Sequence, residues 1–158
     1  MFRPLRRKNR EISLEEAKNL LNTERRGVLA VNGDNGYPYA VPVNFLYDEA
    51  AGKIYFHGSR AGHKADSLKK DDRVCFTVYG NEMPSDEAWA PYMQSVVIFG
   101  RCKLSSGTDE AISHVREFAM KYYPDAGEAE KELSVYGKAV VLYEITIENI
   151  CGKQIQEK

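Results

Sequence analysis

The chain has almost no excess of charge and no long apolar segment. Its 158 residues hold 22 Lys and Arg against 23 Asp and Glu, a formal net charge of -1. That balance creates no field that would attract nucleic acid or an anionic membrane, so we expect neither as a partner. No apolar run approaches the roughly 20 residues of a membrane-spanning helix. The basic N-terminal stretch 3–10 also lacks the apolar core of a signal peptide, and we interpret it as a solvated arm or a strap on a partner subunit.

Cysteine is scarce, and the motifs of several enzyme classes are missing. Cys75, Cys102 and Cys151 are an odd number, and the first two stand in apolar runs typical of buried strands. We interpret them as small buried side chains of a cytoplasmic protein. His57, His63 and Cys75 do not have zinc-ligand spacing, so no metal is expected. The absence of a Gly-x-Ser-x-Gly elbow, a P-loop and a dinucleotide fingerprint leaves hydrolases and Rossmann-type nucleotide binders without support.

The sequence does contain a series of short β-strands separated by turn residues. We expect strands at 26–32, 38–47, 53–58, 73–79, 95–104 and 139–147. Asp34-Asn35-Gly36 predicts a hairpin turn after the first strand, and residues 48–52 predict a turn after the second. Consecutive strands joined by short turns indicate a barrel or a tightly curved sheet, and the length indicates a single domain, residues 1–158.

Two helices are expected beside the strands. Ser13-Leu14-Glu15-Glu16 has the pattern of a capping box, with Leu14, Ala17 and Leu21 on the inner face of the helix that follows. A second helix is predicted to begin at Thr108 and to end before Pro124, and a further helical turn is predicted within 127–133. The inward residues of the second helix are expected to be Val115, Phe118, Ala119 and Tyr122.

Residues 54–64 change from strand to helix through a turn of small residues. Apolar and polar positions alternate over 54–57, and Gly58 and Ser59 then break the run. The turn and the predicted helix start carry three basic residues, Arg60, His63 and Lys64. Free N–H groups at a helix start and a nearby ammonium both favour a phosphate dianion, so the segment predicts a phosphate site. A solvated basic turn fits the same residues, and the segment alone leaves both interpretations open.

Three motifs in a fixed order carry a resemblance that covers most of the chain. They are Gly-Tyr-Pro-x-x-x-Pro-Val-Asn at 36–44, Ile-Tyr-Phe-His…Gly-His-Lys at 54–64 and Ser-Val-Val-x-Phe-Gly at 95–100. With them, residues 13–153 resemble the FMN-binding split-barrel proteins of the pyridoxamine 5'-phosphate oxidase-like superfamily, and within it the 5-nitroimidazole-resistance branch. The resemblance implies a mainly β fold, a split β-barrel of Greek-key type flanked by short helices, and a homodimer that builds the FMN site from both subunits.

The resemblance also implies which residues hold the cofactor. It places the FMN phosphate at Lys64, with Gly58, Ser59, Arg60 and His63 in the same turn. An ordinary solvated helix lysine is the alternative for Lys64. The main chain of the motif Val41, Pro42, Val43, Asn44 is implied to run along the flavin ring. A proline within a strand marks an edge or a bulge, which frees neighbouring backbone groups for a ligand, although an edge proline can also serve only to prevent aggregation.

Two further residues are implied to reach the flavin. The imidazole of His57 would hydrogen-bond the cofactor or give a proton to a reduced substrate, and a structural histidine at a strand end is the alternative. Ser95 would reach the flavin from the strand after a long loop, and otherwise it is a polar residue at a strand start. The loop residues Trp89, Pro91, Tyr92 and Met93 would cover the ring, receive an aromatic substrate or pack at a dimer interface.

Function has to come from the site, because this fold hosts oxidases, reductases and binding proteins. The first hypothesis is an FMN-dependent oxidoreductase that reduces a small aromatic acceptor such as a nitroimidazole, with His57 as the catalytic residue. The second is a flavin- or haem-binding protein without turnover. A pyridoxamine 5'-phosphate oxidase in the strict sense has the least support, because the chain is short and lacks a second arginine cluster for the substrate phosphate.

Overall fold

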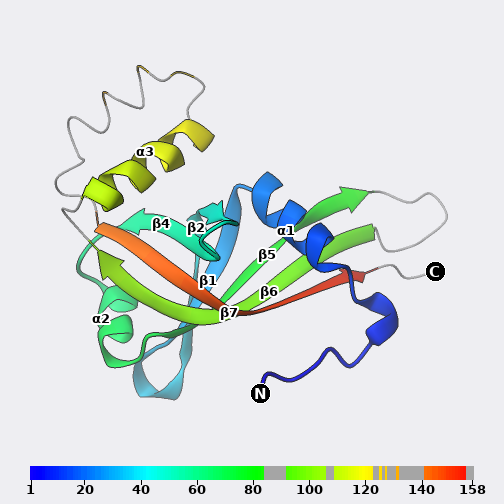
Figure 1. The fold of residues 1–158 in the computed structure, drawn as a ribbon. Helices are drawn as coiled ribbons and strands as arrows, with labels where there is room; N and C mark the ends of the chain where they lie inside the picture. The colour runs from blue at the N-terminus through cyan, green and yellow to red at the C-terminus, as the bar shows by residue number, and fades with distance from the viewer. Residues whose placement is uncertain are drawn as a thin grey trace.

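One curled antiparallel sheet organises the protein (Figure 1). This computed structural model describes residues 1–83, 92–105, 109–122, 125, 127, 131 and 141–155, with the side chains of 109–112 and 115 left out. In that part of the chain the sheet has seven strands in the order β2-β1-β5-β6-β7-β4-β3. The strands are β1 (Arg26–Asn32), β2 (Pro38–Asn44), β3 (Leu46–Asp48), β4 (Lys53–Gly58), β5 (Arg73–Met83), β6 (Tyr92–Ser105) and β7 (Val141–Ile155). The helices are α1 (Leu14–Thr23), α2 (His63–Lys70) and α3 (Asp109–Tyr122), with 3-10 helices η1 (Lys8–Arg10) and η2 (Asp34–Gly36).

The predicted fold class is confirmed: the protein is mainly β, with a curled half-barrel and a few helices. The hairpin between β1 and β2 forms as expected, with Asn35 (φ 58°) and Gly36 (φ 80°) in left-handed conformations. No helix in the described ranges has both the length and the apolar character of a membrane span.

The expected strand 38–47 is wrong, because it breaks at Phe45. Before the break β2 pairs with β1, and after it β3 pairs with β4 at the opposite end of the strand order. The side chain of Phe45 is fully buried, and its ring meets Phe76 edge-on at 5.2 Å between centroids. The chain therefore passes from one edge of the sheet to the other over a buried anchor, which makes the sheet a split barrel.

The closing strand is also longer than expected, because β7 continues past residue 147 to Ile155. A register shift lies between Phe99 and Gly100 of β6, which face Asn149 and Ile147 of β7. The extra residue breaks the alternation of apolar and polar side chains, which is the signal from which a strand is recognised. The strands β5 and β6 likewise extend beyond the predicted 73–79 and 95–104.

The predicted capping box forms at the start of α1. The Ser13 hydroxyl accepts a hydrogen bond from the Glu16 N–H (3.1 Å), and the Glu16 carboxylate accepts one from the Ser13 N–H (2.8 Å). The prediction that Leu14 faces inward is wrong, since it is 56% exposed, and the buried residues of α1 are Ala17, Leu20 and Leu21. Ile12, just before the cap, packs over Gly152 beside Ala17 and so occupies the inner position in place of Leu14.

Two other predictions concern buried residues. Phe118 and Ala119 of α3 are buried and Tyr122 is half-buried, as expected. The side chain of Val115 is not described, and Thr108, Pro124 and most of 127–133 lie outside the described residues. Cys102 is buried, and burial raises the pKa of its thiol to about 12, but Cys75 is only half-buried.

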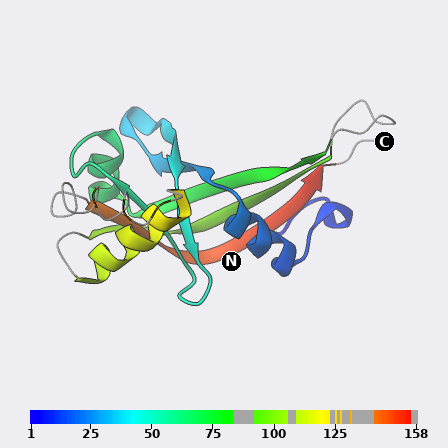
Figure 2. The same ribbon diagram turned by 90° about the horizontal axis from the view of Figure 1, so that it is seen from above.

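The helices α2 and α3 lie at the opposite end of the long strands from the N-terminal arm. Both views place α2 and α3 at one end of β5, β6 and β7 and η1 at the other (Figures 1 and 2). The interior core fills the curl of the sheet between them and includes Phe56, whose ring stacks on Tyr143 at 4.7 Å between centroids. The end of the sheet beside α2 and α3 and the end beside η1 are therefore separate surfaces.

Candidate functional site

The start of α2 leaves backbone donors free next to a cation. The first helical hydrogen bond runs from the Asp66 N–H to the Gly62 carbonyl (3.0 Å), and no side chain in the described part of the chain caps the helix. The amides of residues 63–65 therefore have no acceptor within the helix. Gly62, with φ 114°, adopts a conformation that side chains disfavour, and it turns the chain into the helix.

The Lys64 ammonium lies over the end of β4. Its Nζ is 5.5 Å from the centre of the Tyr143 ring, and a Cβ atom added to Gly58 would lie 3.4 Å from that nitrogen. Among the described residues no carboxylate forms an ion pair with Lys64. This lysine is half-buried, and its charge is available to an external anion.

Ser59 holds the turn between β4 and α2. The Ser59 carbonyl accepts a hydrogen bond from the Tyr143 hydroxyl, and the Ser59 Oγ accepts one from the Ala61 N–H (3.2 Å). The turn is therefore fixed from inside the barrel and by its own side chain. Arg60, the other basic residue of this turn, is exposed.

His63 does not share the position of Lys64. Its ring packs on Tyr39 of β2 at 4.1 Å between centroids, and its Nε2 lies 3.5 Å from Asp34 Oδ2. His63 thus links the start of α2 to β2 and to the hairpin. This contact brings the predicted phosphate residues next to the strand on which the predicted ring residues lie.

The predicted ring residues lie on a sheet edge. In β2, Val41 and Val43 are half-buried against the core, whereas Pro42 and Asn44 are exposed. Pro42 faces Val28 of β1 without any register shift, so it marks an edge and not a bulge. The outer side of β2 has backbone groups that no neighbouring strand of the sheet uses.

His57 projects from the other face of β4. Phe56 points into the core, so His57 points outward, where its ring meets Phe118 of α3 at 4.8 Å and 87°. The residue keeps considerable solvent exposure, yet burial of the ring lowers the pKa of the imidazole below its ordinary 6.5. The structure therefore places His57 and Lys64 on opposite faces of the end of β4.

The C-terminal turn of α3 forms a polar cluster that the sequence did not reveal. Lys121 Nζ donates to the carbonyl oxygens of Glu24 (2.8 Å) and Phe45 (3.2 Å). The Tyr122 hydroxyl accepts from the Phe45 N–H (2.9 Å) and also contacts the carbonyl of Arg25. These bonds fasten α3 to the crossing between β2 and β3, next to Asn44. Helical periodicity predicted that Tyr122 faces inward, but nothing in the sequence pointed to Lys121.

The pKa of Lys121 makes this cluster sensitive to pH. Burial, and then the nearby Arg25, lower it from 10.5 to about 8. A lowered lysine pKa means that the unfolded chain binds the proton more tightly, so stability should rise as pH increases from about 8 to 10.5. We expect the free energy of unfolding of the natural protein to increase, relative to that of Lys121→Met, between pH 7.5 and pH 9.5. Chemical denaturation of both proteins at the two pH values measures this difference. A constant difference between the two proteins would contradict this expectation.

Ser95 stands apart from the other predicted residues. It faces Lys153 across β6 and β7, whereas His57 and Gly58 face Leu142 and Val141 at the other end of β7. Residues 142–153 correspond to roughly 35 Å of strand, so within one chain Ser95 does not join Lys64. Of the loop predicted to precede it, Trp89 and Pro91 lie outside the described residues, and Tyr92 and Met93 belong to β6.

Known proteins share both the sequence pattern and the fold. The family model for pyridoxamine 5'-phosphate oxidase matches residues 13–154. A 5a,11a-dehydrotetracycline/5a,11a-dehydrooxytetracycline reductase from Streptomyces rimosus is 32% identical over 107 residues, which span 66% of this chain and 72% of the reductase.

Two solved structures extend the comparison to the fold. A candidate 5-nitroimidazole antibiotic resistance protein from Bacteroides thetaiotaomicron has a TM-score of 0.71 at 17% sequence identity, and the matched region covers 90% of this chain and 84% of that protein's chain. A FAD-binding protein from Mesorhizobium loti has a TM-score of 0.65 at 24% identity, covering 93% and 98%. The family match spans the whole sheet and both clusters described above, and the chain belongs to the pyridoxamine 5'-phosphate oxidase family.

Proposed function

We propose that this protein binds FMN and acts as an oxidoreductase that reduces a small aromatic acceptor. The observation that carries the proposal is the Lys64 ammonium at the uncapped start of α2, next to the open edge of β2; within the described ranges no carboxylate pairs with it. An isolated cation and free amides favour a phosphate group, and an open strand edge offers hydrogen bonds to a planar ring.

The residues present fit a flavin mononucleotide. Gly58 leaves space beside Lys64 Nζ that a larger side chain would fill, and the amides of 63–65 are free to donate to phosphate oxygens. From Tyr39, which His63 contacts, β2 runs roughly 17 Å to Asn44. In this arrangement the phosphate of the cofactor would lie at α2, and its ring would lie near α3.

Each group has a distinct task in this proposal. Lys64 and the helix amides would bind and orient the phosphate, while Val41 and Val43 would support the apolar part of the ring. Bound flavin supplies the transfer of electrons from a reduced donor to an acceptor. The His57 imidazole, held by Phe118, would move a proton at its exposed edge, and α3 would exclude water from that side.

The names of the similar proteins support the class of acceptor. The Streptomyces rimosus relative is a reductase of a tetracycline derivative, and the similar protein from Bacteroides thetaiotaomicron is named for resistance to 5-nitroimidazole antibiotics. Both names refer to compounds with unsaturated rings that can accept electrons. A nitroaromatic acceptor is therefore the first substrate to test here.

Purification without added cofactor tests the proposal directly. We expect yellow protein whose released cofactor is FMN, and oxidation of a nicotinamide donor when a nitroaromatic acceptor is supplied. Released FAD would disprove the choice of FMN. Flavin-loaded or haem-loaded protein without turnover for any donor and acceptor would favour the alternative, a binding protein, and colourless protein that takes up no flavin would disprove both flavin readings.

We also expect a homodimer, formed through the outer face of the sheet. Ala30, Cys75, Val97 and Phe99 lie on the face opposite the core, and a shallow pocket there includes Ala30, Cys75 and Phe99. The buried residues of α1 and α2 belong to the interior core, and α3 packs on β3 and β4. Among the described residues no helix packs on this face, although Phe2 of the N-terminal arm stacks on Phe99, and such an apolar face favours association with a second copy.

Light scattering checks the dimer. The natural protein should have about twice the chain mass of 17.9 kDa, and Val97→Glu should be a monomer. Met120→Glu, which places the same charge on an exposed position of α3, should stay dimeric. A monomeric natural protein at micromolar concentration would contradict the prediction.

A further inference from the structure

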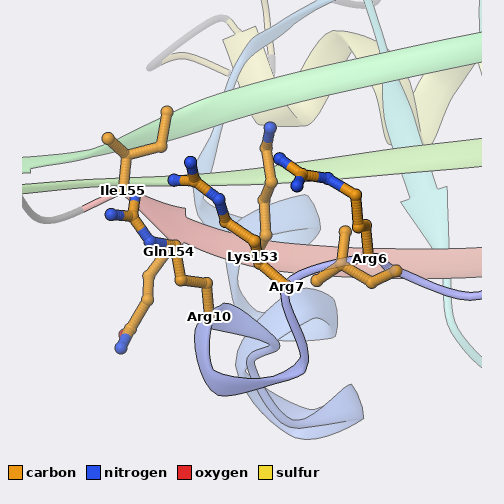
Figure 3. A pocket seen from close by; sticks show the side chains of 7 residues that line it. Arg6, Arg7, Arg10, Lys153, Gln154 and Ile155 are labelled. Carbon is orange, nitrogen blue, oxygen red and sulfur yellow. The ribbon is translucent and has the colours of Figure 1, made fainter.

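A pocket rich in cations lies at the end of the sheet farthest from α2. The N-terminal arm and the end of β7 enclose about 390 Å³, and Arg6, Arg7, Arg10 and Lys153 line it. In Figure 3 the guanidinium groups of Arg6 and Arg7 lie on either side of the Lys153 side chain. Arg10 lies beyond Arg7, near Gln154 and Ile155. Leu5 and Ile155 add apolar surface, and Gln154 adds an amide.

These cations have no acidic partners among the residues that the structure describes. Elsewhere in the described chain, lysines and arginines on several elements form ion pairs, for example Lys18 with Glu49 (2.9 Å) and Arg73 with Asp71 (2.6 Å). Arg6, Arg7, Arg10 and Lys153 form none. Gathering like charges without counter-ions costs free energy, which an anionic ligand would recover.

The arm that carries three of these cations is fastened at several points. The Arg10 N–H donates to the Arg7 carbonyl (3.0 Å), Glu11 forms a β-bridge with Lys153, and the Ile12 N–H donates to the Gly152 carbonyl (3.2 Å). At the other end of the arm, the Phe2 ring stacks on Phe99 with centroids 5.6 Å apart. The backbone that carries the arginines is thus held against β7 before any ligand arrives, which lowers the entropic cost of ordering the arm on binding.

A second, independent feature lies beside Lys153. The Ser95 hydroxyl is buried and has no hydrogen-bond partner within the described residues. Ser95 and Lys153 are direct partners across β6 and β7, so their side chains leave the same face of the sheet. A buried hydroxyl without a partner is uncommon, and this one lies one strand away from Lys153, which lines the pocket.

We propose that this pocket binds a small molecule that carries two or more phosphate groups. Guanidinium groups bind phosphate through paired hydrogen bonds, and four positive charges match a ligand with several negative ones. The volume is that of a small-molecule site. The net charge of -1 gives no extended field for a nucleic acid, and these cations gather in one open pocket. Within one chain this pocket lies at the opposite end of β7 from Lys64.

Calorimetric titration of the full chain tests the pocket with defined probes. Inorganic pyrophosphate, tripolyphosphate and NADPH should bind, and rising salt concentration should weaken binding. Equal affinity for tripolyphosphate and NADPH would indicate that the phosphates alone are recognised. Tighter binding of NADPH than of tripolyphosphate, with displacement of NADPH by pyrophosphate, would indicate that the phosphate groups recognised by the pocket belong to a nucleotide.

Matched variants locate the site. Arg6→Gln combined with Arg7→Gln should weaken binding at least tenfold, because each charge-assisted bond contributes about ten- to a hundredfold. Lys8→Gln is the control, since Lys8 lies in the same arm but pairs with Glu11 (3.3 Å) and does not line the pocket. All of these side chains are exposed, so folding should be unchanged, as circular dichroism would verify.

Three results would overturn the proposal. The first is the absence of binding by all three probes at millimolar concentration. The second is an equal loss of affinity in Lys8→Gln and in the double variant. The third is a single-stranded DNA oligonucleotide that binds more tightly than tripolyphosphate, which would identify a macromolecular surface instead.

Discussion

Replacing Lys64 with alanine should weaken FMN binding ten- to a hundredfold, or about 1.5–3 kcal/mol, and leave riboflavin binding unchanged. The reason is that the ammonium has no carboxylate partner among the described residues and lies above the end of β4 at the uncapped start of α2. Its charge would therefore be used by the phosphate, which riboflavin lacks. Quenching of flavin fluorescence during titration measures both affinities.

Lys69→Ala is the matched control for Lys64. Lys69 belongs to the same helix, but it is exposed and pairs with Asp66 at 2.9 Å. Its removal should affect neither flavin. Equal losses of FMN and riboflavin binding in Lys64→Ala would mean that Lys64 acts through folding, and unchanged affinity would return it to the class of solvated helix lysines.

The second large effect is expected for His57→Ala, which should keep the flavin but lose about a hundredfold or more in reductase rate. One imidazole adds at most a single hydrogen bond to a cofactor held mainly by its phosphate and ring, so the variant should stay yellow. His57 projects from the opposite face of β4 to the face on which Lys64 lies. We therefore expect His57 to affect the rate of the reaction and Lys64 to affect binding of the phosphate.

The pH profile of the rate distinguishes proton transfer from a structural role. Burial lowers the pKa of His57 below 6.5, so the fraction of imidazolium, and with it the rate, should fall as pH rises through that lower pKa. Phe118→Ala uncovers the ring and should move the profile upward toward 6.5. His57→Ala should lose the dependence. A flavin-loaded His57→Ala protein with an unchanged rate and profile would show that the residue is structural.

Local signals in the sequence predicted much of the fold. The capping box at Ser13, the hairpin at Asp34-Asn35-Gly36 and the bounds of β1 and β4 depend on neighbouring residues, and all appear as predicted. The break at Phe45 and the length of β7 could not be predicted in the same way. They depend on which strands pair across the sheet and on the register shift beside Gly100, which involve residues far apart in the chain.

In the candidate site, too, some features follow from local sequence and others from contacts between distant segments. The chain itself determined the turn at Gly58 and Ser59, the helix that starts at His63, and the cation at Lys64, because all three lie within one short segment. Only the tertiary structure decided that His57 turns toward α3, that Lys121 fastens the crossing at Phe45 and that Ser95 stands beside Lys153 and not near Lys64. Local backbone preferences act over a few residues and can be recognised in a sequence. Contacts between distant segments follow from strand order and burial, which no local pattern contains.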